Sequence, residues 1–120
     1  MTQKTLVFGA SLKESRYSNI AVQRLREKKI PVVAFGLRKG NVADVTIDTE
    51  LKSYGNIDTV TLYLNPKRQV AYYDYILSLV PKRVIFNPGT ENLEFVTLLQ
   101  KNGIISEVAC TLVLLSINQY

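Results

Sequence analysis

Residues 4–11 read Lys4-Thr5-Leu6-Val7-Phe8-Gly9-Ala10-Ser11, an apolar run that ends in three small residues. A polar segment follows, and a helical pattern begins near Tyr17-Ser18. A buried strand, a small-residue turn and a helix N-terminus direct free backbone N–H groups and the positive end of the helix dipole toward one point. A glycine in the turn lets a ligand approach the backbone closely. This stretch therefore predicts an anion-binding turn between the first strand and helix of an α/β sheet.

Strand-like and helix-like patterns alternate along the rest of the chain. Further strands are expected at residues 31–35, 58–64, 83–86 and 104–109, with a short one at 45–47. Helices are expected at residues 18–29, 66–80, 91–102 and 111–117, and residues 36–40 are expected to be a basic loop. This alternation favours a parallel sheet covered on both faces. We expect a single α/β domain over residues 1–120, with a Rossmann-like, doubly wound, mainly parallel sheet of five to six strands.

The helical patterns also predict which side chains face the sheet. In the first helix these are Tyr17, Ala21 and Leu25. In the second they are Val70, Tyr73, Leu77 and Val80. Tyr72 and Tyr75 are then left at the surface, where they are candidates for a contact between subunits of a homo-oligomer.

Composition excludes several classes of protein. Of the 120 residues, 47% are hydrophobic and 21% are charged, which is typical of a globular domain. No apolar run approaches the ~20 residues that span a bilayer, so no membrane association is expected. The single cysteine favours a cytoplasmic protein, because it has no internal disulfide partner. The chain lacks histidine, the commonest general acid/base and metal ligand, so no metal site is expected.

The net charge of +5 suits an anionic partner. The densest basic run, at residues 24–29, lies at the end of the first predicted helix, where cations favour the helix dipole and solvent. Basic residues are not interleaved with aromatic ones along a stripe, so a nucleic-acid partner is not expected. The charge therefore favours a small phosphorylated ligand.

In a doubly wound sheet, ligands bind beyond the carboxyl ends of the strands. The segments that follow the predicted strands contain Gly9, Ala10, Ser11, Gly36, Leu37, Arg38, Lys39, Leu64, Asn65, Pro66, Asn87, Pro88, Gly89 and Thr90. These residues are small, amide-bearing or basic, and they include no paired acid and base. The sequence therefore predicts a binding protein rather than an enzyme.

The loop after the second strand distinguishes between nucleotide classes. Only Gly9 matches the dinucleotide fingerprint G-x-G-x-x-G, because Ser11 and Glu14 stand at the other glycine positions. An NAD site needs a carboxylate after the second strand, where this chain has Arg38 and Lys39. These cations suit a phosphate on the ribose, as in NADP or coenzyme A. The alternative is that both are solvated loop charges.

Short motifs give the chain a resemblance to a known family. They are Val7-Phe8-Gly9-Ala10-Ser11, then Ser15-Arg16-Tyr17-Ser18, Leu64-Asn65-Pro66, Phe86-Asn87-Pro88-Gly89-Thr90-Glu91-Asn92 and Lys101-Asn102-Gly103 before Cys110. Over residues 4–115 the chain resembles the small CoA-binding proteins of bacteria and archaea. These are single Rossmann-like domains related to the CoA-binding part of the succinyl-CoA synthetase α subunit.

The resemblance implies a role for each loop. Gly9, Ala10, Ser11 and residues 15–18 would hold the CoA pyrophosphate, and Arg38 with Lys39 would meet the 3′-phosphate. Residues 64–66 would wall the adenine or pantetheine, and residues 87–90 would line the pantetheine path. The family often has Asn-Pro-Lys where this chain has Gly36-Leu37-Arg38. The synthetase's phosphorylated histidine is missing, so ligase activity is not implied.

The resemblance places Cys110 near the ligand. There it is either a small buried hydrophobe or a thiol that forms a mixed disulfide with CoA. The function we expect is non-catalytic binding of CoA or an acyl-CoA. Two alternatives remain open at this point, an NADP-binding reductase-like domain and a protein-interaction module with a decayed nucleotide site.

Overall fold

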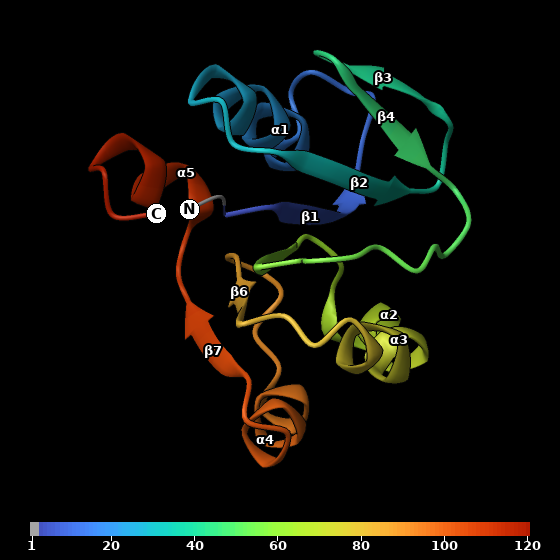
Figure 1. Cartoon of the computed structure of the whole chain (residues 1–120), viewed down its shortest axis with the longest axis vertical. Helices are drawn as coiled ribbons and strands as arrows, with labels where there is room; N and C mark the ends of the chain where they lie inside the picture. Colours follow the sequence, from blue (N-terminus) through green and yellow to red (C-terminus); the bar gives the residue numbers. More distant parts are fainter. Residues whose placement is uncertain (1–2) are drawn as a thin grey trace.

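Seven strands form one sheet in the computed structural model, which describes residues 3–120. The strands are β1 (Thr5–Ala10), β2 (Val32–Gly36), β3 (Gly40–Val42), β4 (Val45–Asp48), β5 (Thr59–Leu62), β6 (Arg83–Phe86) and β7 (Ile105–Val108). Their order across the sheet is β3-β4-β2-β1-β5-β6-β7 (Figure 1). All neighbouring pairs are parallel except β3 and β4, which form an antiparallel hairpin.

Helical segments cover both faces of this sheet. They are α1 (Tyr17–Glu27), α2 (Pro66–Gln69), the 3₁₀ turn η1 (Val70–Tyr72), α3 (Tyr73–Ser78), α4 (Leu93–Lys101) and α5 (Thr111–Ser116). One apolar core lies between the sheet and α3 with α4, around Phe8, Phe86 and Phe95. The other lies between the sheet and α1 with α5, around Val7 and Leu25. The predicted single-domain, doubly wound α/β fold is confirmed, and no helix among residues 3–120 is long and apolar enough to cross a bilayer.

The strand order reverses direction at β1. From β1 the chain passes through α1 to β2 on one side, and it later returns to β5 on the other side. The helices that follow β1 and β5 lie on opposite faces of the sheet. This arrangement opens a crevice at the carboxyl ends of the two strands. The topology therefore places the turn after β1 at the position where such folds bind ligands.

The sheet has one strand more than the five to six expected, because β3 pairs with β4, the short strand expected at residues 45–47. Gly40 does not close a basic loop as expected, because it begins β3 and pairs with Ile47. A two-residue turn, Ala43-Asp44, joins the strands, with Ala43 at φ 55°. Such turns usually carry glycine or asparagine, and β3 is only three residues long. Neither the turn residues nor the short apolar pattern of β3 therefore predicts the hairpin from the sequence.

The predicted faces of the first two helices need correction. Ala21 and Leu25 are buried as predicted, but Tyr17 is 64% exposed. The other buried residues of α1 are Ser18, Asn19 and Val22. The second helix divides into α2, η1 and α3. Of its predicted side chains, Tyr73 is buried and Leu77 is half-buried, whereas Val70 and Val80 are exposed. Gln69 and Ile76 are buried in addition.

Tyr72 and Tyr75 also lie elsewhere than expected. The Tyr72 ring packs edge-on against Phe8 at 5.0 Å and against Phe35 at 5.7 Å. The Tyr75 ring lies 6.0 Å from Phe8, and its hydroxyl donates to the Lys52 carbonyl. Both rings pack against the core, so they do not form the outward-facing pair on which a subunit contact was predicted.

Candidate functional site

The turn after β1 depends on a glycine. Gly9 has φ +101°, a conformation that other residues rarely adopt, and it forms a bulge in the pairing with β2. A Cβ at this position would lie 3.2 Å from both the Tyr63 carbonyl carbon and the Leu64 side chain. Gly9 therefore lets the turn after β1 lie directly against the segment that follows β5.

The N-terminus of α1 presents unpaired amides beside this turn. Arg16 stands at the cap position with an extended backbone, and its side chain makes no capping hydrogen bond. Among residues 3–120, the Tyr17 and Ser18 amides donate to no acceptor, and the first turn has no acidic residue. The Ser11 hydroxyl accepts from the Lys13 amide at 3.1 Å, which curls the loop. This arrangement favours an anion at the start of α1.

Asn19 holds the loop in place, a role that sequence reasoning missed. Its side chain is buried, and Nδ2 donates to the Ser11 carbonyl oxygen at 2.9 Å. Its Oδ1 accepts from Gln23 at 2.6 Å. Its position as a polar residue on the buried face of a helix was the sequence signal that could have identified it.

The loop after β2 lies against the turn after β1. A Cβ on Gly36 would lie 2.3 Å from the Ala10 carbonyl oxygen, so only glycine fits there without a backbone shift. Leu37, Arg38 and Lys39 follow and are exposed. Within residues 3–120, neither Arg38 nor Lys39 forms an ion pair. Both cations are therefore available to an anionic ligand.

The last residue of the neighbouring strand β4 is a carboxylate, Asp48. Burial alone would raise the pKa of Asp48, but hydrogen bonds from the Tyr54 hydroxyl and the Lys52 ammonium outweigh it and lower that pKa. Burial and the bond to Asp48 raise the pKa of Tyr54. Asp48 is thus a paired anion and Tyr54 a neutral phenol near neutral pH.

The segment after β5 begins a helix. Leu64 is buried, and the Asn65 side chain accepts from the Arg68 amide at 3.0 Å. Pro66 is the first residue of α2. The start of a helix favours asparagine at the cap and proline at the next position, so helix capping alone explains Asn65 and Pro66 without a ligand.

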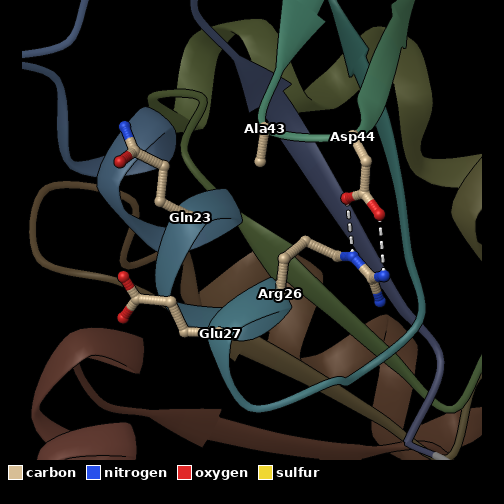
Figure 2. Close-up of a pocket in the computed structure, with 5 residues that line it drawn as sticks. All are labelled: Gln23, Arg26, Glu27, Ala43 and Asp44. Atoms are coloured by element: carbon tan, nitrogen blue, oxygen red, sulfur yellow. Dashed lines mark hydrogen bonds and ion pairs between the residues drawn. The ribbon is translucent and has the colours of Figure 1, made fainter.

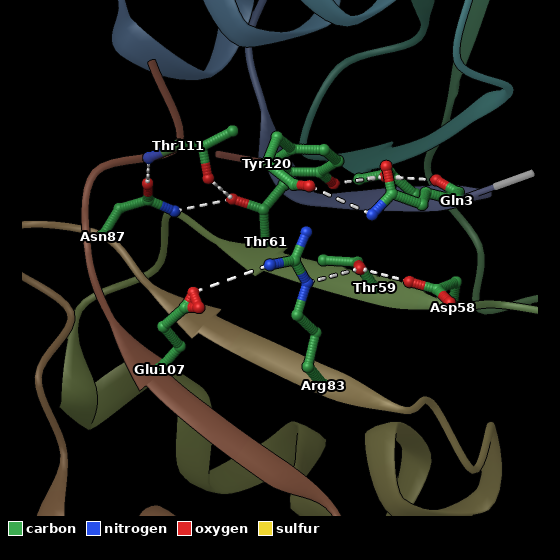
Figure 3. Close-up of polar contacts among 10 residues, drawn as sticks. Gln3, Asp58, Thr59, Thr61, Arg83, Asn87, Glu107, Thr111 and Tyr120 are labelled. Carbon is green, nitrogen blue, oxygen red and sulfur yellow. Dashed lines mark hydrogen bonds and ion pairs between the residues drawn. The ribbon is translucent and has the colours of Figure 1, made fainter. Parts of the chain in front are cut away.

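The loop after β6 is held by its own side chains. Nδ2 of Asn87 donates to the Thr61 hydroxyl at 2.7 Å, and Oδ1 accepts from the Thr111 amide at 2.8 Å (Figure 3). Nδ2 also donates to the Leu62 carbonyl at 2.8 Å. The Thr90 hydroxyl donates to the Asn87 carbonyl. Both polar side chains are therefore occupied within the protein. The exposed residues of this loop are Pro88 and Gly89.

A buried glutamine joins the last two segments. Nε2 of Gln69 donates to the carbonyl oxygens of Leu64 and Thr90, at 2.8 Å each. Together with the contacts at Gly36 and Gly9, this bridge makes the four predicted segments neighbours along one edge, in the order β2, β1, β5, β6. Sequence reasoning did not identify Gln69.

Cys110 lies at the same edge. It follows β7 and stands at the N-cap of the six-residue α5, partly buried. The next residue, Thr111, donates its amide to Asn87 and contacts the Thr61 hydroxyl at 2.8 Å. The structure thus places Cys110 beside the loop after β6, and its chemistry stays a prediction.

Two other polar features lie at the opposite, amino-terminal edge of the sheet. Figure 2 shows a hollow lined by Gln23, Arg26, Glu27, Ala43 and Asp44. There Arg26 donates twice to Asp44 at 2.8 Å, and this bond lowers the pKa of the carboxyl group.

The second of these features surrounds Arg83 (Figure 3). Arg83 donates to Thr59 at 2.9 Å, lies 3.5 Å from the Glu107 carboxylate and stacks 4.5 Å from the Tyr120 ring centre. Arg83 is therefore paired within the protein through Nε and Nη1, whereas its buried Nη2 has no hydrogen-bond partner among residues 3–120.

Comparisons with solved structures agree with this fold. A crystal structure of an uncharacterized protein is 46% identical, with a TM-score of 0.96, and the match covers 100% of this chain and 99% of the other. A hypothetical protein from Pyrococcus horikoshii OT3 is 26% identical, with a TM-score of 0.83 over 93% of this chain and 80% of that one. A protein from Thermus thermophilus shares the fold at 20% identity, with a TM-score of 0.86, covering 99% and 91%.

No curated protein matches the chain. The model of one protein family does match it, over residues 3–116, and its description is CoA binding domain. That range includes all four segments at the carboxyl edge and extends into α5. The chain therefore belongs to the CoA binding domain family.

Proposed function

We propose that the protein binds coenzyme A or an acyl-CoA without catalysing a reaction on it. The observation that carries the proposal is the contact between the four segments at the carboxyl edge, within a chain that belongs to a CoA-binding family. They combine free amides, two unpaired cations and loops of small residues. Each of these suits one part of CoA.

The strand order suggests how the ligand lies. Neighbouring strands are about 4.8 Å apart, so the edge from β2 to β6 spans about 14 Å. In this arrangement Arg38 and Lys39 receive the 3′-phosphate, and the amides of Tyr17 and Ser18 receive the pyrophosphate. The pantetheine then extends past residues 64–66 toward Pro88 and Gly89. An elongated ligand fits this edge better than a compact one.

The residues at the edge support binding without catalysis. The chain has no histidine, and the Asp48 carboxylate is paired with Lys52 and Tyr54. The Asn87 and Thr90 side chains are bonded within the protein. Within this proposal the protein acts by holding the ligand. The single cysteine supports a cytoplasmic location.

A charge reversal at Arg38 tests the proposal. Arg38→Glu is expected to weaken CoA binding by about tenfold to a hundredfold, because one charge-assisted phosphate contact is replaced by repulsion. Dephospho-CoA, which lacks the 3′-phosphate, should bind both proteins nearly equally. The measurement is the CoA-dependent shift in thermal unfolding, compared with the shift that dephospho-CoA produces.

Lys101→Glu is the matched control. Lys101 is exposed at the C-terminal end of α4, at the opposite edge of the sheet from the proposed site. Its replacement by glutamate changes the net charge by the same amount as Arg38→Glu does. Its CoA affinity should stay within about twofold of wild type at moderate salt. Equal losses in both variants would mean that only the overall charge matters. A shift with NADP but none with CoA would favour a reductase-like domain instead.

A further inference from the structure

Gln69 is buried where the helical pattern predicted that its neighbour Val70 would be buried. It is the last residue of α2, and its side chain is fully buried, whereas the neighbouring Val70 is 55% exposed. A buried amide is unfavourable unless its hydrogen bonds are made. The side chain of Gln69 makes three of them, and each joins a different part of the chain.

Two of these bonds connect the two segments proposed to contact the pantetheine. Nε2 lies 2.8 Å from the Leu64 carbonyl oxygen, after β5, and 2.8 Å from the Thr90 carbonyl oxygen, after β6. Both partners accept, so the NH₂ group must face them, and its two protons supply one bond each. One planar group therefore sets the distance between the two segments.

The third bond anchors the glutamine itself. Oε1 of Gln69 accepts from Asn92 at 2.9 Å. Nδ2 of Asn92 also donates to the Tyr73 hydroxyl at 2.8 Å, and its Oδ1 caps α4 through the Phe95 amide at 3.2 Å. The cap of α4 and the face of α3 thus fix the orientation of Gln69 from behind the two segments.

We infer that Gln69 is a positioning residue for the pantetheine half of the ligand site. The inference rests on the proposed function. By holding residues 64–66 and 87–90 at one separation, Gln69 shapes the second half of the edge, and its hydrogen bonds reach no residue proposed to hold the nucleotide. The nucleotide half is formed by other parts of the chain, namely the turn after β1, the start of α1 and the loop after β2.

Two ligands separate the halves of the site. Coenzyme A contains both halves, and adenosine 3′,5′-bisphosphate contains the nucleotide without the pantetheine. Gln69→Glu should weaken CoA binding by about tenfold, because a carboxylate facing two carbonyl oxygens repels them. The affinity for the bisphosphate should change by less than about twofold. Loss of a buried hydrogen bond in the nucleotide half would change that affinity by more. Calorimetric titration of the folded proteins measures both affinities.

The Gln69→Glu variant has an internal check in its pH dependence. Once protonated, the carboxyl group that this substitution introduces can donate to one of the two carbonyl oxygens, so CoA affinity should partly recover as the pH is lowered. Gln100→Glu is the matched control, because Gln100 is exposed on α4. It should bind both ligands as wild type does, at every pH. A purely structural role for Gln69 would instead weaken both ligands in the same proportion, and this result would overturn the inference.

A measurement on the wild type needs no variant. The side-chain NH₂ protons of Gln69 should shift in the NMR spectrum on addition of CoA, and much less on addition of the bisphosphate. Equal shifts with both ligands would contradict the role of Gln69, and so would the absence of a shift when CoA binds. Neither result would affect the proposed function. If the wild type bound no CoA, the proposed function would fail first, and the inference with it.

Discussion

At Asp48, burial and hydrogen bonding have opposite effects on the pKa. Desolvation favours the neutral acid, whereas the Tyr54 hydroxyl and the Lys52 ammonium favour the carboxylate, and the net result is a pKa below the ordinary 3.8. A carboxyl group whose pKa is lower in the folded state stabilises the fold above its unfolded-state pKa. This contribution is lost as the pH falls through the folded-state value. Asp48 therefore makes the protein sensitive to acid below about pH 4.

Tyr54→Phe tests this pair. At pH 7 the variant should lose about 1 kcal/mol of unfolding free energy, because the Asp48 carboxylate loses a buried donor. At pH 3 the loss should be smaller, because protonation of Asp48 in the unfolded state has already reduced the stability that this pair contributes to the wild type. Urea unfolding at both pH values measures the difference. Tyr17→Phe, at an exposed tyrosine, should change neither value, and an equal loss from Tyr54→Phe at both pH values would exclude the assignment.

Some individual residues were predictable because their role depends on near neighbours in the chain. Asn65 and Pro66 begin a helix by local rules, and both lie where those rules place them. Gln69 was not predictable, since it acts on a carbonyl oxygen that only the folded chain brings within reach. For Asn19 the buried helix face was a signal, but its partner, the Ser11 carbonyl, was not visible in the sequence.

Among the helices, α3 ends in an unfavourable backbone conformation. Val80 has φ 47°, in the left-handed region that β-branched residues avoid. Its side chain is 73% exposed, so packing does not compensate for the strain. The following Pro81 is buried and leads into β6. A residue that tolerates this conformation should serve better at position 80.

Val80→Asn should therefore stabilise the protein by about 1 kcal/mol, because asparagine adopts the left-handed region more readily. Thermal or urea unfolding measures the gain. Val113→Asn is the control, since Val113 is similarly exposed (53%) but lies inside α5. This control should give no gain. A Val80→Asn protein no more stable than wild type would show that the strain is relieved in some other way.

Elements with strong local signals agreed with the sequence, and those with weak signals did not. The helix expected at 91–102 is α4, with Asn92 as its cap and Gly103, at φ +71°, just beyond its end. The helix expected at 66–80 divides at η1, and the buried side chain at this point is Gln69, which makes tertiary hydrogen bonds, rather than Val70. β3 was missed because three residues and an Ala-Asp turn carry no period or turn signature.

In the whole molecule, the parallel order of the strands creates the site. The segments after β2, β1, β5 and β6 are distant in sequence and meet only because parallel strands end at one edge. Alternating patterns were enough to predict that edge and its residues. The contacts that hold the segments together, such as Gly36 against Ala10, depend on register between strands, which a single sequence does not specify.

Isothermal calorimetry of the wild-type protein with coenzyme A is the decisive measurement of whether this edge of the sheet binds CoA. We expect saturable binding of one CoA per chain, weaker affinity for dephospho-CoA, and a loss of affinity as salt rises, because phosphate contacts carry much of the interaction. Absence of binding by CoA and acyl-CoA, at concentrations where NADP or another nucleotide saturates the protein, would contradict this expectation.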